Sequence, residues 1–179
     1  MDTGDRLHFI GTATTVVTLG SFTLLTDPNF LHRGQRAYLG WGLSSRRLTD
    51  PAVEPEDLPQ LDAVLLSHLH GDHFDRVSRD RLDRSAPVLS TPHAVRRLDS
   101  WGFATHALRT WQEHSLDGPM GVDFVARCAP SVVVPVHHDD YTVFRSPLSD
   151  FVERFAASGT PAVLRSPRRG DVVSLEPPA

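Results

Sequence analysis

Lysine is absent from this sequence of 179 residues, cysteine occurs once, and no apolar run approaches the about 20 residues that a membrane-spanning helix needs. The single cysteine, Cys128, excludes a disulfide framework within one chain. The first six residues are polar and lack the apolar core of a secretory signal. We therefore predict a protein of the reducing cytoplasm without a membrane span.

An excess of positive charge is also missing. All 18 basic residues are arginines and they face 22 acidic residues, which gives a formal net charge of −4. This balance does not indicate a nucleic acid or an anionic membrane as partner. The length and the 40% hydrophobic content fit one soluble globular domain over residues 1–179.

Strand and helix patterns interleave along the chain. Short apolar or alternating runs predict strands at 7–10, 15–19, 22–26, 63–67, 88–90 and 131–136, and two more within 162–175. Helical spacing predicts helices at 75–84, 91–102, 121–129 and 146–159. Residues 31–60 show no sustained period and are predicted to form a long, functional loop. The fold class is therefore α/β or a layered α+β.

The richest chemistry follows the apolar run 63–67. His68 and His70 lie two residues apart, so their side chains point the same way in an extended segment. Gly71 allows a sharp turn, after which Asp72 and His73 can face the same cavity from another direction. Imidazole and carboxylate groups suit zinc, iron and manganese. This turn predicts a site for one or two metal ions at the end of a buried strand.

The run His68-Leu69-His70-Gly71-Asp72-His73 resembles the His-x-His-x-Asp-His signature of the metallo-β-lactamase superfamily. The loop 11–14, the segment 25–28 and the late Pro135-Val136-His137 are similar to the branch of L-ascorbate-6-phosphate lactonase-like proteins and N-acylphosphatidylethanolamine phospholipase D. The resemblance implies a layered α+β fold, the αββα sandwich, with the active site along one edge.

The resemblance also implies two groups of metal ligands. The first metal would be bound by His68 and His70, and the second by Asp72, His73 and His137. Zinc is the expected ion, with manganese or iron as alternatives.

Two further assignments come from the same resemblance. Asp27 corresponds to an aspartate that orients a ligand histidine from behind. Pro135-Val136-His137 aligns with the late-histidine motif better than His138 does, so His137 is the preferred ligand.

The family pattern contains two ligands that have no counterpart here: a lone histidine and an aspartate that bridges both metals. We predict an internal deletion near residues 117–121, which shortens the second half of the sandwich. His114 is the candidate replacement for the missing histidine. The candidate replacements for the bridging aspartate are Asp117, Asp139 and Asp140.

The leading functional hypothesis is metal-dependent hydrolysis of an ester, lactone or phosphodiester, with a small molecule as substrate. A metal-activated water would attack, and Asp72 would orient it and take its proton. The alternative is a catalytically impaired, metal-binding or structural remnant of the family. Arg46 and Arg47 are candidates to meet an anionic substrate, and Trp41 is a candidate to line a pocket.

Overall fold

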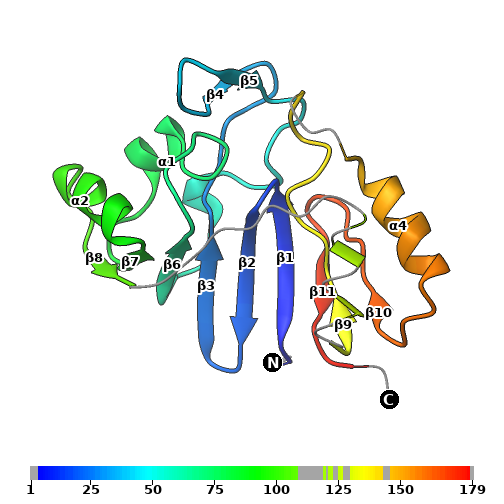
Figure 1. Ribbon diagram of the computed structural model, residues 1–179. Helices are drawn as coiled ribbons and strands as arrows, with labels where there is room; N and C mark the ends of the chain where they lie inside the picture. Colours follow the sequence, from blue (N-terminus) through cyan, green and yellow to red (C-terminus); the bar gives the residue numbers. More distant parts are fainter. Residues whose placement is uncertain are drawn as a thin grey trace.

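The computed structural model describes residues 4–108, 119, 121–122, 125–126, 130–142 and 146–177. In these residues one large mixed sheet has the strand order β11-β1-β2-β3-β6-β7-β8 (Figure 1). Its strands are β1 (Arg6–Gly11), β2 (Thr14–Leu19), β3 (Phe22–Thr26), β6 (Ala63–Leu66), β7 (Val88–Ser90), β8 (Thr105–Ala107) and β11 (Val172–Ser174).

The sheet has an antiparallel and a parallel half. β11, β1, β2 and β3 pair antiparallel, whereas β3, β6, β7 and β8 are parallel neighbours. β3 and β6 are in register, with Thr26 opposite Leu65. The carboxyl ends of these two strands therefore meet at the same sheet edge, where Asp27 and Ser67 come next in the chain.

Two helices cover one face of this sheet. α1 (Arg76–Arg81) begins after Asp75, whose carboxylate accepts the backbone N–H groups of Val77 and Ser78. α2 (Pro92–Ser100) begins after Thr91, whose hydroxyl accepts from Ala94. The main apolar core joins these helices to the strands and consists of Ile10, Val16, Leu25, Phe30, Val64, Leu66, Phe74, Leu82, Val88, Ala94, Leu98 and Phe103.

The second half of the chain is smaller. β9 (Val132–Val133) and β10 (Val163–Leu164) pair parallel in a sheet of their own. α4 (Leu148–Ala157) lies beside them, on the side of the molecule away from α1 and α2 (Figure 1). The predicted layered α+β class is confirmed by this arrangement.

The structure changes several details of the predicted elements. The segment 31–60 holds a hairpin, β4 (Arg36–Tyr38) and β5 (Ser44–Arg46), and a 3-10 turn η1 (Pro55–Asp57). β8 is an edge strand that was not predicted, and the predicted strand 131–136 is reduced to β9. These strands are two or three residues long, which is too short for a visible alternation of polar and apolar residues.

Part of the predicted helix 121–129 lies outside the described residues. Within the described part, residues 119, 121–122 and 125–126 are helical. The helical conformation therefore begins before the predicted first residue. A separate search of the described residues finds no helix long and apolar enough to cross a membrane.

Candidate metal centre

The histidine turn begins where β6 ends, and its backbone lies against the β4–β5 hairpin. The N–H of Gly71 donates to the carbonyl oxygen of Tyr38 at 2.7 Å. A Cβ atom at Gly71 would lie 2.7 Å from the backbone nitrogen of Tyr38, so only glycine permits this contact. The turn is therefore fixed on both sides, by the sheet and by the hairpin.

The turn gathers its imidazole rings into one cluster with a ring from late in the chain. The ring centroid of His68 lies 4.5 Å from that of His70 and 4.1 Å from that of His73. The ring of His137 lies 4.4 Å from that of His73. Among the described residues, His68, Asp72 and His73 each place a potential ligand atom within 4.8 Å of the others.

Asp72 lies at the centre of this cluster. Its Oδ2 atom is 3.3 Å from Nε2 of His137 and 3.8 Å from Nε2 of His73. Its Oδ1 atom is buried and has no hydrogen-bond partner among the described residues. Burial raises the pKa of Asp72, but the hydrogen bond from His137 and the charges of His73 and His137 outweigh it, so the net pKa lies below 3.8.

Asp27 and Ser67 form hydrogen bonds with the Nδ1 atoms of two of the histidines. Nδ1 of His73 donates to Oδ2 of Asp27 at 3.0 Å, because a carboxylate can only accept. The hydroxyl of Ser67 donates to Asp27 at 2.9 Å, so its oxygen accepts from Nδ1 of His68 at 2.9 Å. Both histidines then keep a lone pair on Nε2, the form in which imidazole binds a metal. Ser67 has no predicted role, although its position directly before His68 is a usable signal.

His137 is brought to the cluster by a strained backbone. His137 and Thr12 both have positive φ angles, of 65° and 54°, which are unusual for a residue with a branched or bulky side chain. The N–H of His137 donates to the carbonyl oxygen of Thr12 at 2.6 Å, and the N–H of Thr12 donates to Oδ2 of Asp140 at 2.6 Å. The loop after β1 thus positions the late histidine.

The carboxylate of Asp140 is fully occupied by hydrogen bonds that hold the loop after β1. Besides Thr12, it accepts from the hydroxyl of Thr49 and from Nη2 of Arg169, the latter at 2.8 Å. Burial raises the pKa of Asp140, but the hydrogen bonds of Thr49 and Thr12 and the charges of Arg47 and Arg169 hold it below 3.8. Its side chain therefore anchors the loop, and does not offer a free carboxylate for a metal.

Arg47 supports the histidine turn through Asn29. The prediction that Arg47 meets an anionic substrate is therefore wrong. Its side chain is completely buried, lies 5.5 Å from the ring centroid of Tyr141 and donates to the amide oxygen of Asn29. Asn29 also accepts from the hydroxyl of Tyr141 at 3.0 Å and donates to the carbonyl oxygen of Gly71 at 2.7 Å. Arg46, by contrast, is exposed.

The neighbours of His137 face elsewhere. His138 stacks on Phe9 at 5.7 Å between ring centroids, and its Nδ1 lies 3.3 Å from the carboxylate of Asp139. The carboxylate of Asp139 accepts the backbone N–H of Leu148, the first residue of α4, at 3.3 Å. His137 is therefore the residue of the pair that reaches Asp72. The two other candidate ligands, His114 and Asp117, lie outside the described residues.

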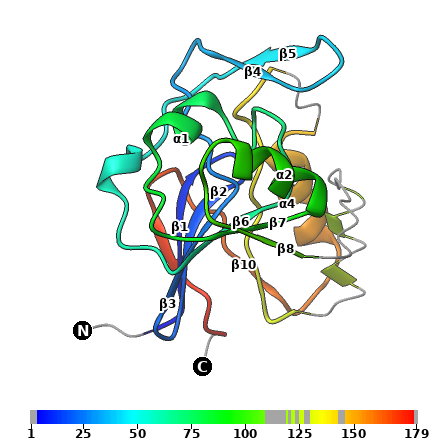
Figure 2. The ribbon, with the colours of Figure 1, turned by 90° about the vertical axis from the view of Figure 1, so that its left-hand side faces the viewer.

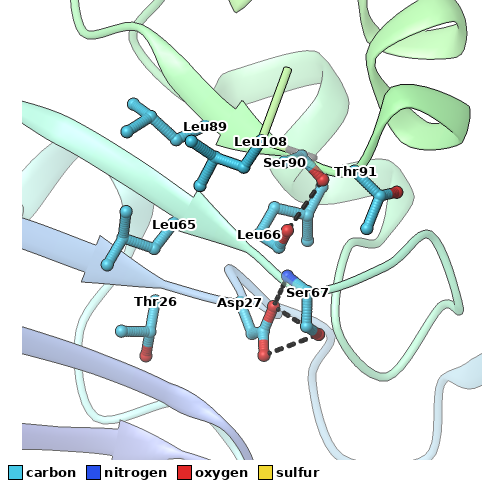
Figure 3. A pocket seen from close by; sticks show the side chains of 9 residues that line it. All are labelled: Thr26, Asp27, Leu65, Leu66, Ser67, Leu89, Ser90, Thr91 and Leu108. Atoms are coloured by element: carbon cyan, nitrogen blue, oxygen red, sulfur yellow. Dashed lines mark hydrogen bonds between the residues drawn. The ribbon is translucent and has the colours of Figure 1, made fainter. Parts of the chain in front are cut away.

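An apolar cavity of about 180 Å³ adjoins the centre (Figure 3). Its wall includes Asp27 and Ser67, drawn with their hydrogen bonds, and the side chains of Leu65 and Leu89 from the parallel half of the sheet. Asp27 and Ser67, which orient His73 and His68, therefore also form part of the cavity wall.

The donor set fits a divalent cation. The buried, unpartnered Oδ1 of Asp72 is an acceptor without a donor, and such an atom costs stability unless a cation or a donor binds it. His68, His73 and Asp72 each offer one ligand atom within 4.8 Å of the others, and imidazole nitrogen with carboxylate oxygen is a set that zinc prefers.

Comparison with known proteins agrees with this geometry. Residues 23–157 match a family model described as a β-lactamase superfamily domain. The chain belongs to the metallo-β-lactamase fold superfamily. The predicted family resemblance is therefore confirmed.

A curated protein is similar to this chain in sequence. N-acyl-phosphatidylethanolamine-hydrolyzing phospholipase D 1 of Caenorhabditis elegans is 28% identical over 118 residues, which are 65% of this chain and 29% of that protein. The matched segment thus spans less than a third of that relative's length.

Two solved structures share the fold. An isothiocyanate hydrolase from Delia radicum gut bacteria superposes with a TM-score of 0.73 at 15% identity, covering 94% of this chain and 98% of that one. Igni18, a metallo hydrolase from the archaeon Ignicoccus hospitalis, superposes with a TM-score of 0.69 at 14% identity, covering 97% and 99%. At such low identity these two likenesses support the fold of the superfamily.

Proposed function

We propose that this chain is a metal-dependent hydrolase that acts on an ester, lactone or phosphodiester. The observation that carries the proposal is the approach of His73 and His137 to Oδ2 of Asp72, whose other oxygen, Oδ1, is buried and without a hydrogen-bond partner among the described residues. Three protein ligands with an open position form the ligand set of a catalytic zinc site.

Each side of the cluster would hold one ion. Asp72, His73 and His137 would bind the principal metal, and His68 and His70 would contribute to a second one. His114 and Asp117 stay predicted as replacements for the ligands that the family pattern lacks here. The deletion near residues 117–121 and the single domain over residues 1–179 also remain parts of this proposal.

The chemistry divides between the metal and the protein. When bound, the metal lowers the pKa of a coordinated water to about 7 and polarises the scissile group. Asp72 is ionised at neutral pH because its pKa lies below the ordinary value, so its carboxylate can accept a hydrogen bond from the attacking water and orient it. Asp27 and Ser67 hold the rings of His73 and His68 in place while this happens.

The substrate class follows from the relatives and from the superfamily chemistry. The Caenorhabditis elegans relative is named for the hydrolysis of a phospholipid, which is a phosphodiester. The solved neighbours are named as hydrolases of an isothiocyanate and as a metallo hydrolase. All these reactions add water to an electrophilic carbon or phosphorus, which is the step that the site is equipped to assist.

The test combines metal analysis with turnover. The metal content of the purified protein would be counted by mass spectrometry, and the protein loaded with Zn²⁺, Mn²⁺ or Fe²⁺ would be assayed on p-nitrophenyl acetate, a γ-lactone and bis(p-nitrophenyl) phosphate. We expect one or two metal ions per chain and hydrolysis of at least one substrate. Asp72→Ala should abolish turnover. Asp83→Ala, which removes an exposed carboxylate that accepts hydrogen bonds from the next two residues, Arg84 and Ser85, should not.

The opposite result has a definite meaning. If no metal binds under any loading condition and none of the substrates is hydrolysed, the proposal is wrong and the chain is the structural remnant of the alternative hypothesis. If metal binds in stoichiometric amounts but Asp72→Ala hydrolyses the substrate as fast as the unchanged protein, the role assigned to Asp72 is wrong.

A further inference from the structure

The β4–β5 hairpin carries the two most exposed large apolar side chains of the described structure, Trp41 and Leu43. At its tip Trp41 is 97% exposed, Leu43 is 64% exposed and Tyr38 is 60% exposed. We call these three residues the hairpin tip. Single exposed apolar residues are normal on a protein surface, but three in six positions form a patch, and such patches mark sites of interaction.

The tip is held outward by its own backbone. Gly40, Trp41 and Gly42 all have positive φ angles, of 84°, 53° and 76°. Leu39 and Leu43 close the turn, since the N–H of Leu39 donates to the carbonyl oxygen of Leu43 at 2.9 Å. Trp41 is thus presented to solvent by a fixed turn and does not fold back onto the hairpin. Both views place the hairpin beyond the rest of the molecule (Figures 1 and 2).

Arginines surround the base of the same hairpin. Arg36 and Arg46 are direct cross-strand neighbours, and both are exposed. Like charges in that position repel each other and destabilise the pair of strands. Neither has an ion-pair partner among the described carboxylates. The guanidinium of Arg36 is instead held by Ser44, at 2.9 Å to its hydroxyl. A shared anion would remove this repulsion.

The charge of the hairpin contrasts with the charge of the remaining chain. Residues 31–49 contain four arginines and no aspartate or glutamate, so the other 14 arginines face all 22 acidic residues, which leaves −8 for the rest. The net charge of −4, which gives no sign of an anionic partner, hides this separation. A negatively charged surface would attract the hairpin and repel the body, and so orient the molecule.

We propose that the β4–β5 hairpin docks the protein onto an anionic lipid surface. The hairpin tip would enter the headgroup region, where tryptophan and tyrosine are favoured because one part of each ring is apolar and the other is polar. Arg36 and Arg46 lie further from the tip, and their long side chains would reach the phosphates. A second copy of the chain fits less well, because two such hairpins would bring their arginines together.

The position of the hairpin gives this docking a consequence for the metal centre. A Cβ atom at Gly40 would lie 3.4 Å from Nε2 of His70, so the turn that carries Trp41 adjoins the histidine cluster. A lipid surface bound by the hairpin would therefore lie next to the proposed active site. The docking itself does not depend on hydrolysis, and it can be tested in a protein without metal or activity.

The β2–β3 turn provides a matched control. It presents Phe22, which is 61% exposed, but the nearby backbone groups of Gly20 and Thr23 donate to the carboxylates of Asp5 and Asp62. An exposed aromatic residue beside acidic groups should not bind an anionic surface. The full chain would be sedimented with vesicles of phosphatidylcholine alone and of phosphatidylcholine with phosphatidylglycerol. The variants would be Trp41→Ser, Trp41→Phe, Arg36→Gln with Arg46→Gln, and Phe22→Ser.

We expect binding to the anionic vesicles that weakens with added salt. Trp41→Ser should reduce it at least about tenfold and the double change Arg36→Gln with Arg46→Gln about 25-fold, or about fivefold for each arginine, whereas Trp41→Phe and Phe22→Ser should retain it. The tryptophan emission of the unchanged protein should shift to the blue on binding, and this shift should disappear in Trp41→Phe. Thermal melting would check that the surface variants remain folded.

Three results would overturn the proposal. The first is the absence of sedimentation with anionic vesicles at millimolar lipid. The second is an equal loss of binding in Phe22→Ser and Trp41→Ser. The third is a dimer that forms in solution and depends on Trp41, because the hairpin would then be an interface between copies of the chain.

Discussion

The ligands proposed for the principal metal are held more firmly by the surrounding structure than the ligands proposed for the second metal. On one side, Asp72, His73 and His137 have side chains that are 11%, 8% and 28% exposed, and Asp27 and Thr12 hold the two histidines. On the other side, His70 is exposed and meets His68 edge to face. Side chains that are packed and hydrogen-bonded keep the geometry that a metal needs, whereas exposed ones must be ordered when the metal binds.

Of the two proposed metal sites, we therefore expect the site of Asp72, His73 and His137 to be the stronger one. Three of the five non-glycine residues with positive φ angles in the described structure, Thr12, Asp27 and His137, lie on the packed side. Such conformations cost about 1–3 kcal/mol each and persist where the surrounding structure enforces them. The fold thus favours the site of His73 over that of His70.

The largest predicted effect separates the two sides directly. His73→Ala should reduce turnover at least about a thousandfold, or ~4 kcal/mol of transition-state free energy, because it removes an oriented ligand. His70→Ala should cost about tenfold or less. The measurement is kcat/KM of both variants on the best substrate of the panel, at saturating metal. Equal losses would mean that both sides contribute equally and that our comparison is mistaken.

The second-largest effect is expected from removal of the metal, which should lower the free energy of unfolding. The buried Oδ1 of Asp72 loses its partner when the metal leaves, so the protein without metal should unfold more easily. At a free metal concentration a hundred times the Kd, the expected difference is about 2.7 kcal/mol in the free energy of unfolding. Urea unfolding with and without a chelator measures it. Identical midpoints would show that no metal binds the folded state preferentially.

Loss of Asp27, whose carboxylate orients the ring of His73, should have a smaller effect. Asp27→Ala removes the carboxylate that accepts from Nδ1 of His73, and metal affinity should fall about 10- to 100-fold. Asp5→Ala removes a carboxylate that accepts from Gly20, and it should leave the affinity unchanged. Competition with a chromophoric chelator gives both values. An affinity of Asp27→Ala equal to that of Asp5→Ala would contradict the role of Asp27.

His68, on the weaker side, should give the smallest effect. Burial, followed by the charges of His73 and His70, lowers its pKa from 6.5 to about 4. Between these pH values the unfolded chain binds a proton that the folded, metal-free protein refuses, so stability falls as the pH drops from 6.5 and levels off below 4. Because the ring is partly exposed, screening by water should limit the loss to about 1 kcal/mol.

The measurement for His68 is a series of urea midpoints between pH 7 and pH 4 in the presence of chelator. His68→Gln should have a flatter profile than the unchanged protein, since glutamine does not titrate. If both profiles fall in parallel, another group is responsible for the acid sensitivity.

The sequence predicted the contiguous part of the site well. The turn from His68 to His73 follows a buried strand, so its residues are neighbours in the chain as well as in space. The contact of Asp27 with His73 could also be anticipated, because parallel neighbouring strands bring the residues after them to one edge. The ligand roles of these residues stay predictions until metal is measured.

The remaining support could not be predicted because it is not local. Asp140 accepts from Thr12 and Arg169, which are far from it in the chain. Arg47 was taken for a substrate contact because an arginine in a loop is usually exposed, and only the packing of Asn29 and Tyr141 shows otherwise. The hairpin was missed because its strands of three residues carry no visible period.

The hydrogen bond between Arg169 and Asp140 bears on when the proposed metal centre can assemble during synthesis. A growing chain that has emerged as far as His73 already contains the turn and the strands that hold it. His137 can reach its final position only when Asp140 is anchored, and Arg169 follows Asp140 by 29 residues. The ligands proposed for the principal metal therefore come together only after Arg169 has been made, so a shorter nascent chain can offer a metal no more than the histidine turn.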